Sequence, residues 1–192
     1  MDQEPLVVRM ALESLEAADD EILKKLAQPI AAQLGSEDRL IRQTATRLLT
    51  RASDNTYHAI SEAAVKHGWQ AGVSVAVAFT ERRDKFHNYP IDIAIRVLKK
   101  DHNEVLKLEA ARLLQLAMGD LMPDGDAVPE AFLGYTSRYD LSQNLADMTL
   151  LNSKWSSFYP TQFELVNLEI ERAMAMSQPL DTALLDLVLA QI

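Results

Sequence analysis

Apolar residues recur along most of the chain with the spacing of amphipathic α-helices. Between residues 37 and 53 they follow one another at steps of one, three or four positions, which places them on one stripe of a helix. This stripe contains Leu40, Ile41, Ala45, Leu48, Leu49 and Ala52. Between residues 103 and 118 the same spacing predicts an inward stripe of Val105, Leu106, Leu108, Ala110, Leu113, Leu114 and Ala117, with Lys107, Arg112 and Gln115 facing outward.

Helices are predicted over most of the remaining chain as well. Their approximate ranges are 6–18, 21–34, 57–67, 69–82, 91–99, 161–177 and 180–192, and a shorter helix is expected at 141–151. No alternation of apolar and polar residues between turn signals, as strands require, competes with this pattern. We therefore expect an all-α fold.

Two of these helices share a motif. Residues 40–49 and 105–114 each contain an apolar pair, then a cation, then an alanine three positions later, and finally an arginine and two leucines. Looser copies lie near the start of the chain and at residues 69–79. The central alanines, at nearly constant intervals, are Ala11, Ala45, Ala76 and Ala110. The three later copies each follow another predicted helix, so the repeating unit is a helical hairpin, and stacked hairpins form an α-solenoid with a right-handed superhelix.

This pattern resembles the HEAT family of helical repeats, in the short form found in many bacterial proteins. The matching elements are Asp38 with Ile41, Arg42 and Ala45, Asn103 with Leu106, Lys107 and Ala110, and Pro29 in the place of a kinking proline in the first helix. The resemblance covers roughly residues 5–118, and we expect a repeat domain at 1–118 of about four units, of which the first and third are degenerate. It implies that the second helices of the hairpins line a concave surface.

The remaining chain does not repeat. Residues 119–160 hold six of the twelve aromatic residues and form an aromatic-rich loop or insert. One interpretation is a binding patch made of Tyr135, Arg138, Tyr139 and Trp155. In the other, which we favour, these rings pack back over the end of the repeats.

Both ends of the chain look cut. Residues 161–192 form a C-terminal helical pair that looks truncated, because its last helix, 180–192, is apolar almost all round where a terminal repeat needs a polar face. At the other end, residues 6–18 look like the second helix of a hairpin without its first. The chain is then part of a larger polypeptide, or docks on a protein partner, or buries 180–192 centrally; self-association through Leu180–Ile192 is a further expectation.

Composition narrows the function classes. The 192 residues are 48% apolar and carry 19 Lys and Arg against 28 Asp and Glu, a net charge of −9. Such a balance disfavours nucleic acid as the main partner, since that affinity comes from cations that neutralise phosphates. The absence of cysteine excludes disulfides, thiolate metal sites and cysteine nucleophiles. No signal peptide or membrane span is predicted, and if the chain is full length a cytoplasmic location is favoured.

Motifs for catalysis, metals and cofactors are missing from the sequence. The four histidines make no metal-binding pair, and the acidic residues between 120 and 130 do not have the spacing of a calcium loop. Phosphate-binding glycine loops and serine-hydrolase motifs do not occur either. We therefore expect no catalytic residue, no metal and no cofactor.

A basic stripe is the most organised polar pattern. Arg39, Arg42, Arg47 and Arg51 stand on one predicted helix, and Lys107 and Arg112 repeat two of these positions. In a concave groove these cations would bind an acidic peptide, a phosphate group or nucleic acid. In the alternative, Arg42 and Lys107 bind the turn of a neighbouring unit and hold layers together.

The preferred function is that of a non-catalytic helical-repeat scaffold or protein-interaction module. The alternative is a DNA-binding protein or DNA glycosylase for alkylated bases, because enzymes of that class have a HEAT-like fold of comparable size.

Overall fold

The computed structural model describes residues 4–82, 88–100, 102–119, 145–177, 186 and 188–190. These residues are mostly helical and contain no strand, which confirms the all-α prediction. The chain divides into two compact units, Met1–Arg82 and Arg83–Ile192. Within the described ranges, no helix is both long and apolar enough to cross a bilayer.

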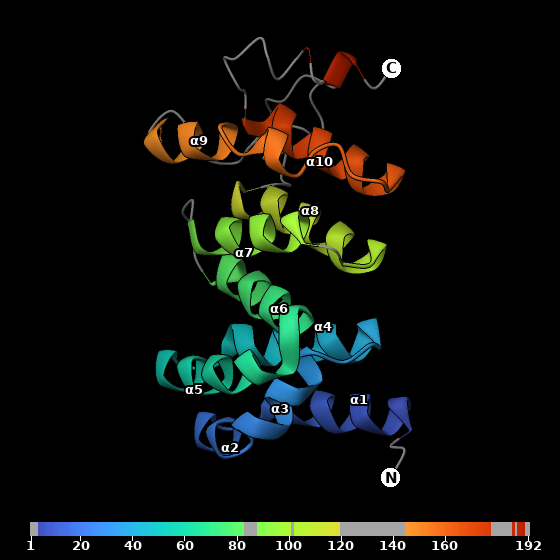
Figure 1. Cartoon of the computed structure of the whole chain (residues 1–192). Coiled ribbons are helices and arrows are strands. Elements are labelled where there is room, and N and C mark those ends of the chain that lie inside the picture. Colours follow the sequence, from blue (N-terminus) through green and yellow to red (C-terminus); the bar gives the residue numbers. More distant parts are fainter. Residues whose placement is uncertain are drawn as a thin grey trace, which may run out of the picture. The chain divides into compact units, whose positions relative to one another are not determined.

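Helices fill the described part of the first unit (Figure 1). They are α1 (Pro5–Ser14) with the 3-10 turn η1 (Leu15–Ala17), α2 (Asp20–Lys25), α3 (Ala27–Leu34), α4 (Arg39–Arg51), α5 (Asp54–Ala64) with the 3-10 turn η2 (Val65–His67), and α6 (Gly68–Glu81). Most bounds agree closely with the sequence pattern. The exception is the helix predicted at 21–34, where the structure has two helices.

Pro29 explains the division between α2 and α3. A proline has no N–H to donate to the carbonyl four residues earlier, here that of Lys25, and its ring crowds that carbonyl. The backbone of Leu26 leaves the helical region at this point, with φ −96° and ψ 15°. Hydrogen bonding resumes at once, because the N–H of Ile30 donates to the Leu26 carbonyl at 3.0 Å.

The helices of the first unit pack in a regular order. The hairpin partners α3 and α4 pack together, and so do α5 and α6. Between hairpins, α1 packs on α4, α4 on α6, and α3 on α5. Side-chain caps fix where helices begin: the Asp38 carboxylate accepts hydrogen bonds from the N–H groups of Leu40 and Ile41, and Ser53 Oγ accepts one from Thr56.

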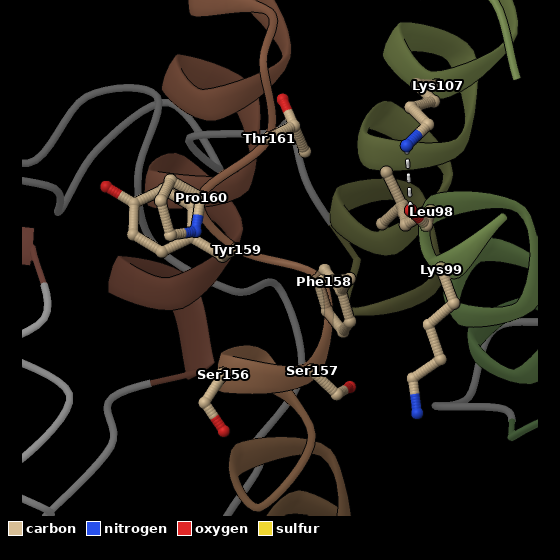
Figure 2. A pocket seen from close by; sticks show the side chains of 9 residues that line it. All are labelled: Leu98, Lys99, Lys107, Ser156, Ser157, Phe158, Tyr159, Pro160 and Thr161. Atoms are coloured by element: carbon tan, nitrogen blue, oxygen red, sulfur yellow. Dashed lines mark hydrogen bonds between the residues drawn. The ribbon is translucent and has the colours of Figure 1, made fainter. Parts of the chain in front are cut away.

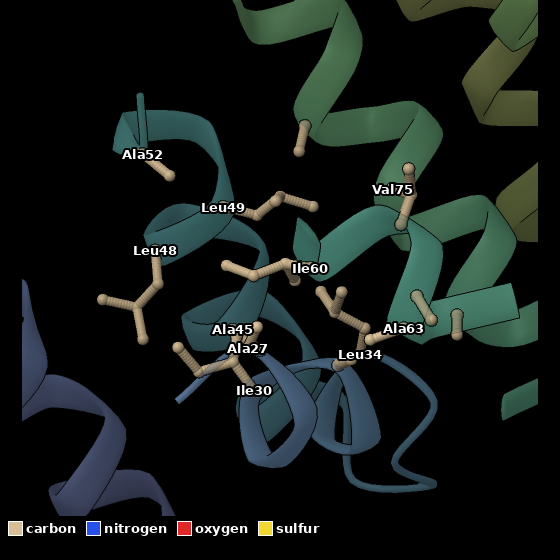
Figure 3. Packing of buried hydrophobic residues seen from close by; sticks show 14 of the residues in the cluster. Ala27, Ile30, Leu34, Ala45, Leu48, Leu49, Ala52, Ile60, Ala63 and Val75 are labelled. Atoms are coloured by element: carbon tan, nitrogen blue, oxygen red, sulfur yellow. The ribbon is translucent and has the colours of Figure 1, made fainter. Parts of the chain in front are cut away.

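Small and branched side chains fill the space between these helices (Figure 3). Ala45 is fully buried at the centre of α4, where a methyl group lets a neighbouring helix approach closely. Leu34, Leu48, Leu49 and Ile60 are also fully buried around it. These contacts are the core of the first unit.

The second unit contains another hairpin and a further helical pair. Its elements are α7 (Asn88–Lys99), α8 (Glu104–Ala117), α9 (Leu145–Asn152), the 3-10 turn η5 (Trp155–Ser157) and α10 (Glu164–Ser177). Helix α8 packs on α7 and on α10, and α10 packs on α9. The Asn103 side chain caps α8, and Gly119, at φ 79°, follows its end as the sequence predicts.

Three side chains on the motif helices differ from the predicted faces. Leu40 and Val105 were expected inside and are 51% and 60% exposed. They occupy the same motif position, at the edge of the stripe. Two turns further along each helix, the same edge carries an exposed arginine, Arg47 or Arg112. Gln115 was expected outside and is buried, because its amide binds Glu169 of α10.

The aromatic residues that the structure describes after α8 are packed inside the second unit. Trp155 is fully buried, and Phe158 and Tyr159 are nearly so. The Trp155 and Phe158 rings meet edge to face with centroids 5.5 Å apart. Tyr135, Arg138 and Tyr139 lie outside the described residues, as does most of the predicted helix at 180–192.

Candidate partner-binding surface

The cations at the matching motif positions, Arg42 and Lys107, each bind backbone carbonyls of their own hairpin. Arg42 is buried, and its Nη1 donates to the carbonyls of Ser36 at 2.7 Å and Glu37 at 2.9 Å, in the turn before α4. Lys107 Nζ donates to the Leu98 carbonyl, at the end of α7, at 3.1 Å. Lys107 therefore binds the carbonyl end of the first helix of its hairpin, where positive charge is favoured, whereas Arg42 binds the turn that follows the first helix of its hairpin.

Arg51 connects two hairpins. At the end of α4, its Nη2 donates to the Ala18 carbonyl at 3.1 Å, just beyond η1. Arg82, one repeat later at the end of α6, donates from Nη1 to the carbonyls of Thr50 and Ala52 at the end of α4. The interval from Arg51 to Arg82 equals that from Ala45 to Ala76, and the interval from Ala18 to Ala52 equals that from Ala11 to Ala45. No role for Arg82 is predicted from the sequence, although Arg82 follows Arg51 at the same interval at which Ala76 follows Ala45.

Arg47 and Arg112 form ion pairs. Arg47 pairs with Glu16 at 2.8 Å, and both side chains are largely exposed. Arg112 pairs with Glu169 at 3.3 Å. Arg39 is exposed at the first residue of α4. Apart from Arg39, the predicted basic stripe is thus engaged by groups of its own unit.

Glu169 is the most constrained carboxylate among the described residues of the second unit. It is buried, and it accepts hydrogen bonds from Gln115 Nε2 at 2.8 Å and Arg172 Nη1 at 2.9 Å. Burial raises its pKa, but these bonds and the charges of Arg172 and Arg112 outweigh burial, so the pKa lies below the ordinary value. The cluster joins α8 to α10.

A small open hollow of about 240 Å³ lies on the second unit (Figure 2). Lys99 and Lys107 line one side, and residues 156–161 line the other. Several of its donors already have protein partners: Lys107 binds Leu98, and Ser157 Oγ donates to the Lys154 carbonyl. Few of its polar groups are therefore free to bind a small anion.

Helix α1 exposes an apolar face. Leu6, Val7 and Met10 are 64%, 62% and 59% exposed, and Ala11 beside them is exposed too. Leu12, on the opposite side of the helix, is buried. Three large aliphatic side chains within two turns are an unusual surface for one short helix.

Three positions on α4 that are equivalent to residues of this face of α1 are buried. The interval from Ala11 to Ala45 relates Val7 to Ile41 and Met10 to Thr44 as well. In this next layer Ile41, Thr44 and Ala45 are 5%, 3% and 0% exposed. The same positions are therefore exposed on α1 and buried on α4, which packs against α1, α3 and α6.

The first helix of the next hairpin shows the same contrast. Ile22 is 43% exposed, whereas its equivalent at the same interval, Thr56, is fully buried. Pro29 and Ala63 make one more such pair, exposed and buried respectively. Helices α1 and α2 lie at the same end of the first unit (Figure 1). We call Val7, Met10, Ala11, Ile22 and Pro29 the first-layer face.

In the part of the chain that the structure describes, no three His, Asp or Glu side chains are grouped to hold a metal ion. No protein-family model matches the chain, and no curated protein or solved structure is detectably similar to it. The geometry of the residues themselves is therefore the basis for assigning a function.

Proposed function

We propose that the chain is a HEAT-like helical-repeat module that binds protein, without catalytic activity, and that the first-layer face is its docking surface. One observation carries this proposal: five positions of this face are exposed where their equivalents in the next layer are buried. The exposed set is uncharged, as expected for a surface that another helix covers.

The contacts between hairpins support a solenoid. Packing of α1 on α4 and of α4 on α6 follows the nearest-neighbour order of stacked repeats. Arg51 and Arg82 bind the end of the preceding second helix in the same way, so the same contact occurs twice in the first unit. In a helical bundle without repeats, the same contact would not be expected to occur again at the interval of the motif.

The size of the face limits what binds there. Full burial of one large aliphatic side chain is worth about 1.5–3 kcal/mol, so the exposed parts of Val7 and Met10 are worth about 2–4 kcal/mol together. Association itself costs at least about 4 kcal/mol. A stable complex therefore needs an occupant that also covers Ile22 and Pro29 on the neighbouring helices.

Solution scattering tests the architecture. A compact 192-residue globule has a radius of gyration of about 16 Å. A solenoid of stacked hairpins is longer, and we expect a larger radius and an asymmetric distance distribution for the monomer. A monomer with the radius of the compact globule would contradict the solenoid.

A photo-crosslinking residue at position 10 tests the binding surface. We expect a specific protein to crosslink in the source cells, and we would then purify it and measure its affinity by calorimetry. Met10→Glu should weaken binding at least tenfold. Leu40→Glu is the matched control, because Leu40 is an exposed aliphatic residue of α4. The proposal fails if Met10→Glu binds as tightly as the wild type.

A further inference from the structure

We infer that the first-layer face of one copy is covered by the C-terminal segment, residues 180–192, of a second copy of this chain. This inference rests on the proposed docking surface and names its partner. It brings together two apolar features of the chain: the exposed face at α1 and the last segment of the sequence.

The first unit itself indicates the kind of occupant. The residues equivalent to the first-layer face are buried on α4 and α5, and only helices pack closely on these two: α1, α3 and α6 pack on α4, and α2, α3 and α6 pack on α5. The missing cover is therefore a helix with an aliphatic stripe.

Residues 180–192 have the sequence of such a helix. Leu180, Leu184, Leu187 and Val188 are spaced as Leu23, Ala27, Ile30 and Ala31 are in α2 and α3, where all four are buried. A second stripe contains Leu185, Leu189 and Ile192. A helix that is apolar on both stripes requires cover on both sides.

The described residues of this segment agree with that requirement. The N–H of Ala190 donates to the Asp186 carbonyl at 3.0 Å, a helical hydrogen bond. Leu189 is 54% exposed, so its side chain is available to a partner. The charges of the segment are Asp181 and Asp186, both negative.

Charge and the number of binding elements in each chain favour a second copy. Beside Ile22, helix α2 and its N-cap residue expose two cations, Lys24 and Lys25, and two anions, Asp19 and Glu21, so an acidic segment that lies on the lysine side meets positive charge. Each copy has one exposed face and one segment whose apolar pattern fits it. Two copies that exchange segments satisfy both pairs, as a closed symmetric dimer requires. A head-to-tail chain of copies makes the same contacts without closing.

Disulfide trapping tests the contact directly, because the chain has no cysteine to give a background. We would mix full-length Met10→Cys protein with full-length Leu189→Cys protein, one of them carrying a tag, and oxidise the mixture. We expect a mixed disulfide dimer at least fivefold more abundant than in the control mixture of Leu40→Cys with Leu189→Cys. Circular dichroism confirms that each variant is folded.

The other products would overturn the inference. Links between two Met10→Cys chains without the mixed product would indicate an interface between two α1 helices. A doubly substituted chain, Met10→Cys with Leu189→Cys, that forms only an internal link would indicate docking within one copy.

Sedimentation gives a second, independent measurement. We expect a dimer or larger species at tens of micromolar for the wild type and for Leu40→Glu, and a monomer for Met10→Glu. A wild-type monomer at these concentrations with no mixed disulfide would refute the second copy as partner. If a different protein still crosslinks at position 10 in that case, the proposed docking surface stands and only its occupant is wrong.

Discussion

Arg82→Ala should destabilise the first unit far more than Arg47→Ala, although both changes remove one arginine that makes an ion pair. The Arg82 side chain is only 13% exposed. Its guanidinium donates to the carbonyls of Leu49 at 3.4 Å, Thr50 at 2.9 Å and Ala52. It also lies 4.7 Å from the centre of the Tyr57 ring.

The magnitude follows from these contacts. Hydrogen bonds from a charged donor contribute about 1.5–3 kcal/mol each when water cannot replace them, and the cation–ring contact adds about 0.5–1 kcal/mol. Water reaches the end of α4 once the side chain is removed and recovers part of this. We therefore expect Arg82→Ala to lower the free energy of unfolding by about 2–4 kcal/mol. Arg47 pairs with Glu16 in the open, so Arg47→Ala should cost about 0–1 kcal/mol.

Urea unfolding followed by circular dichroism measures the difference. Asp54→Asn separates the ion pair from the carbonyl contacts: Asp54 is 2.5 Å from Arg82, but its side chain is 76% exposed, so its loss should cost less than about 1 kcal/mol. Arg82→Lys should recover only part of the loss, because an ammonium group cannot span several carbonyls as a guanidinium does. An Arg82→Ala variant that is no less stable than Arg47→Ala would contradict this role of the Arg82 contacts.

Three further predictions concern packing, charge and nucleic acid. Ala45→Leu should cost about 1–3 kcal/mol by overpacking the core, whereas Ala11→Leu, at the equivalent exposed position, should change the urea midpoint little. Because Gln115, Arg172 and Arg112 together lower the pKa of Glu169, its carboxylate stabilises the fold above the ordinary value of 4.5, and this stability is lost as the pH falls through the lower folded-state value. The advantage of the wild type over Glu169→Gln should therefore be largest near neutral pH and shrink in urea titrations toward pH 3; a gap that widens in acid would contradict the assignment. Most cations of the predicted stripe bind groups of their own unit, so we expect no gel shift of duplex DNA at low salt, and a shift with steep salt dependence would instead favour the DNA-binding alternative.

Helical periodicity predicted the secondary structure well because the apolar residues of each helix share one face. The prediction from periodicity was wrong where a proline interrupts the helix or where an apolar residue lies at the edge of the apolar stripe. Pro29 divides one predicted helix into two, and Leu40 and Val105 sit at the edge of the stripe, where the helix turns their side chains to solvent.

The candidate site was harder to predict than the fold. Arginines at a constant register look alike in a sequence whether they face a groove or close a turn, and only the carbonyls within reach of Arg42 and Arg51 distinguish the two. The exposed face of α1 could be anticipated as a helix without its partner. Which of its residues are uncovered became clear only when Val7 and Met10 were compared with the buried residues one repeat later.

Arg51 lies 33 residues after its acceptor Ala18 and Arg82 lies 30 residues after its acceptor Ala52, and these spacings bear on how the chain tolerates changes of length. A tandem duplication of residues 20–53 would place a new arginine as far along the sequence from the original Ala52 as Arg51 is from Ala18. The added hairpin would therefore keep the arginine–carbonyl contact. An insertion of a few residues inside α4 would rotate the end of this helix. Arg51 would then point away from the Ala18 carbonyl, and the carbonyls of Thr50 and Ala52 would point away from Arg82. The arginine contacts of the first unit would therefore be preserved when a whole hairpin is duplicated and lost when a few residues are inserted into α4.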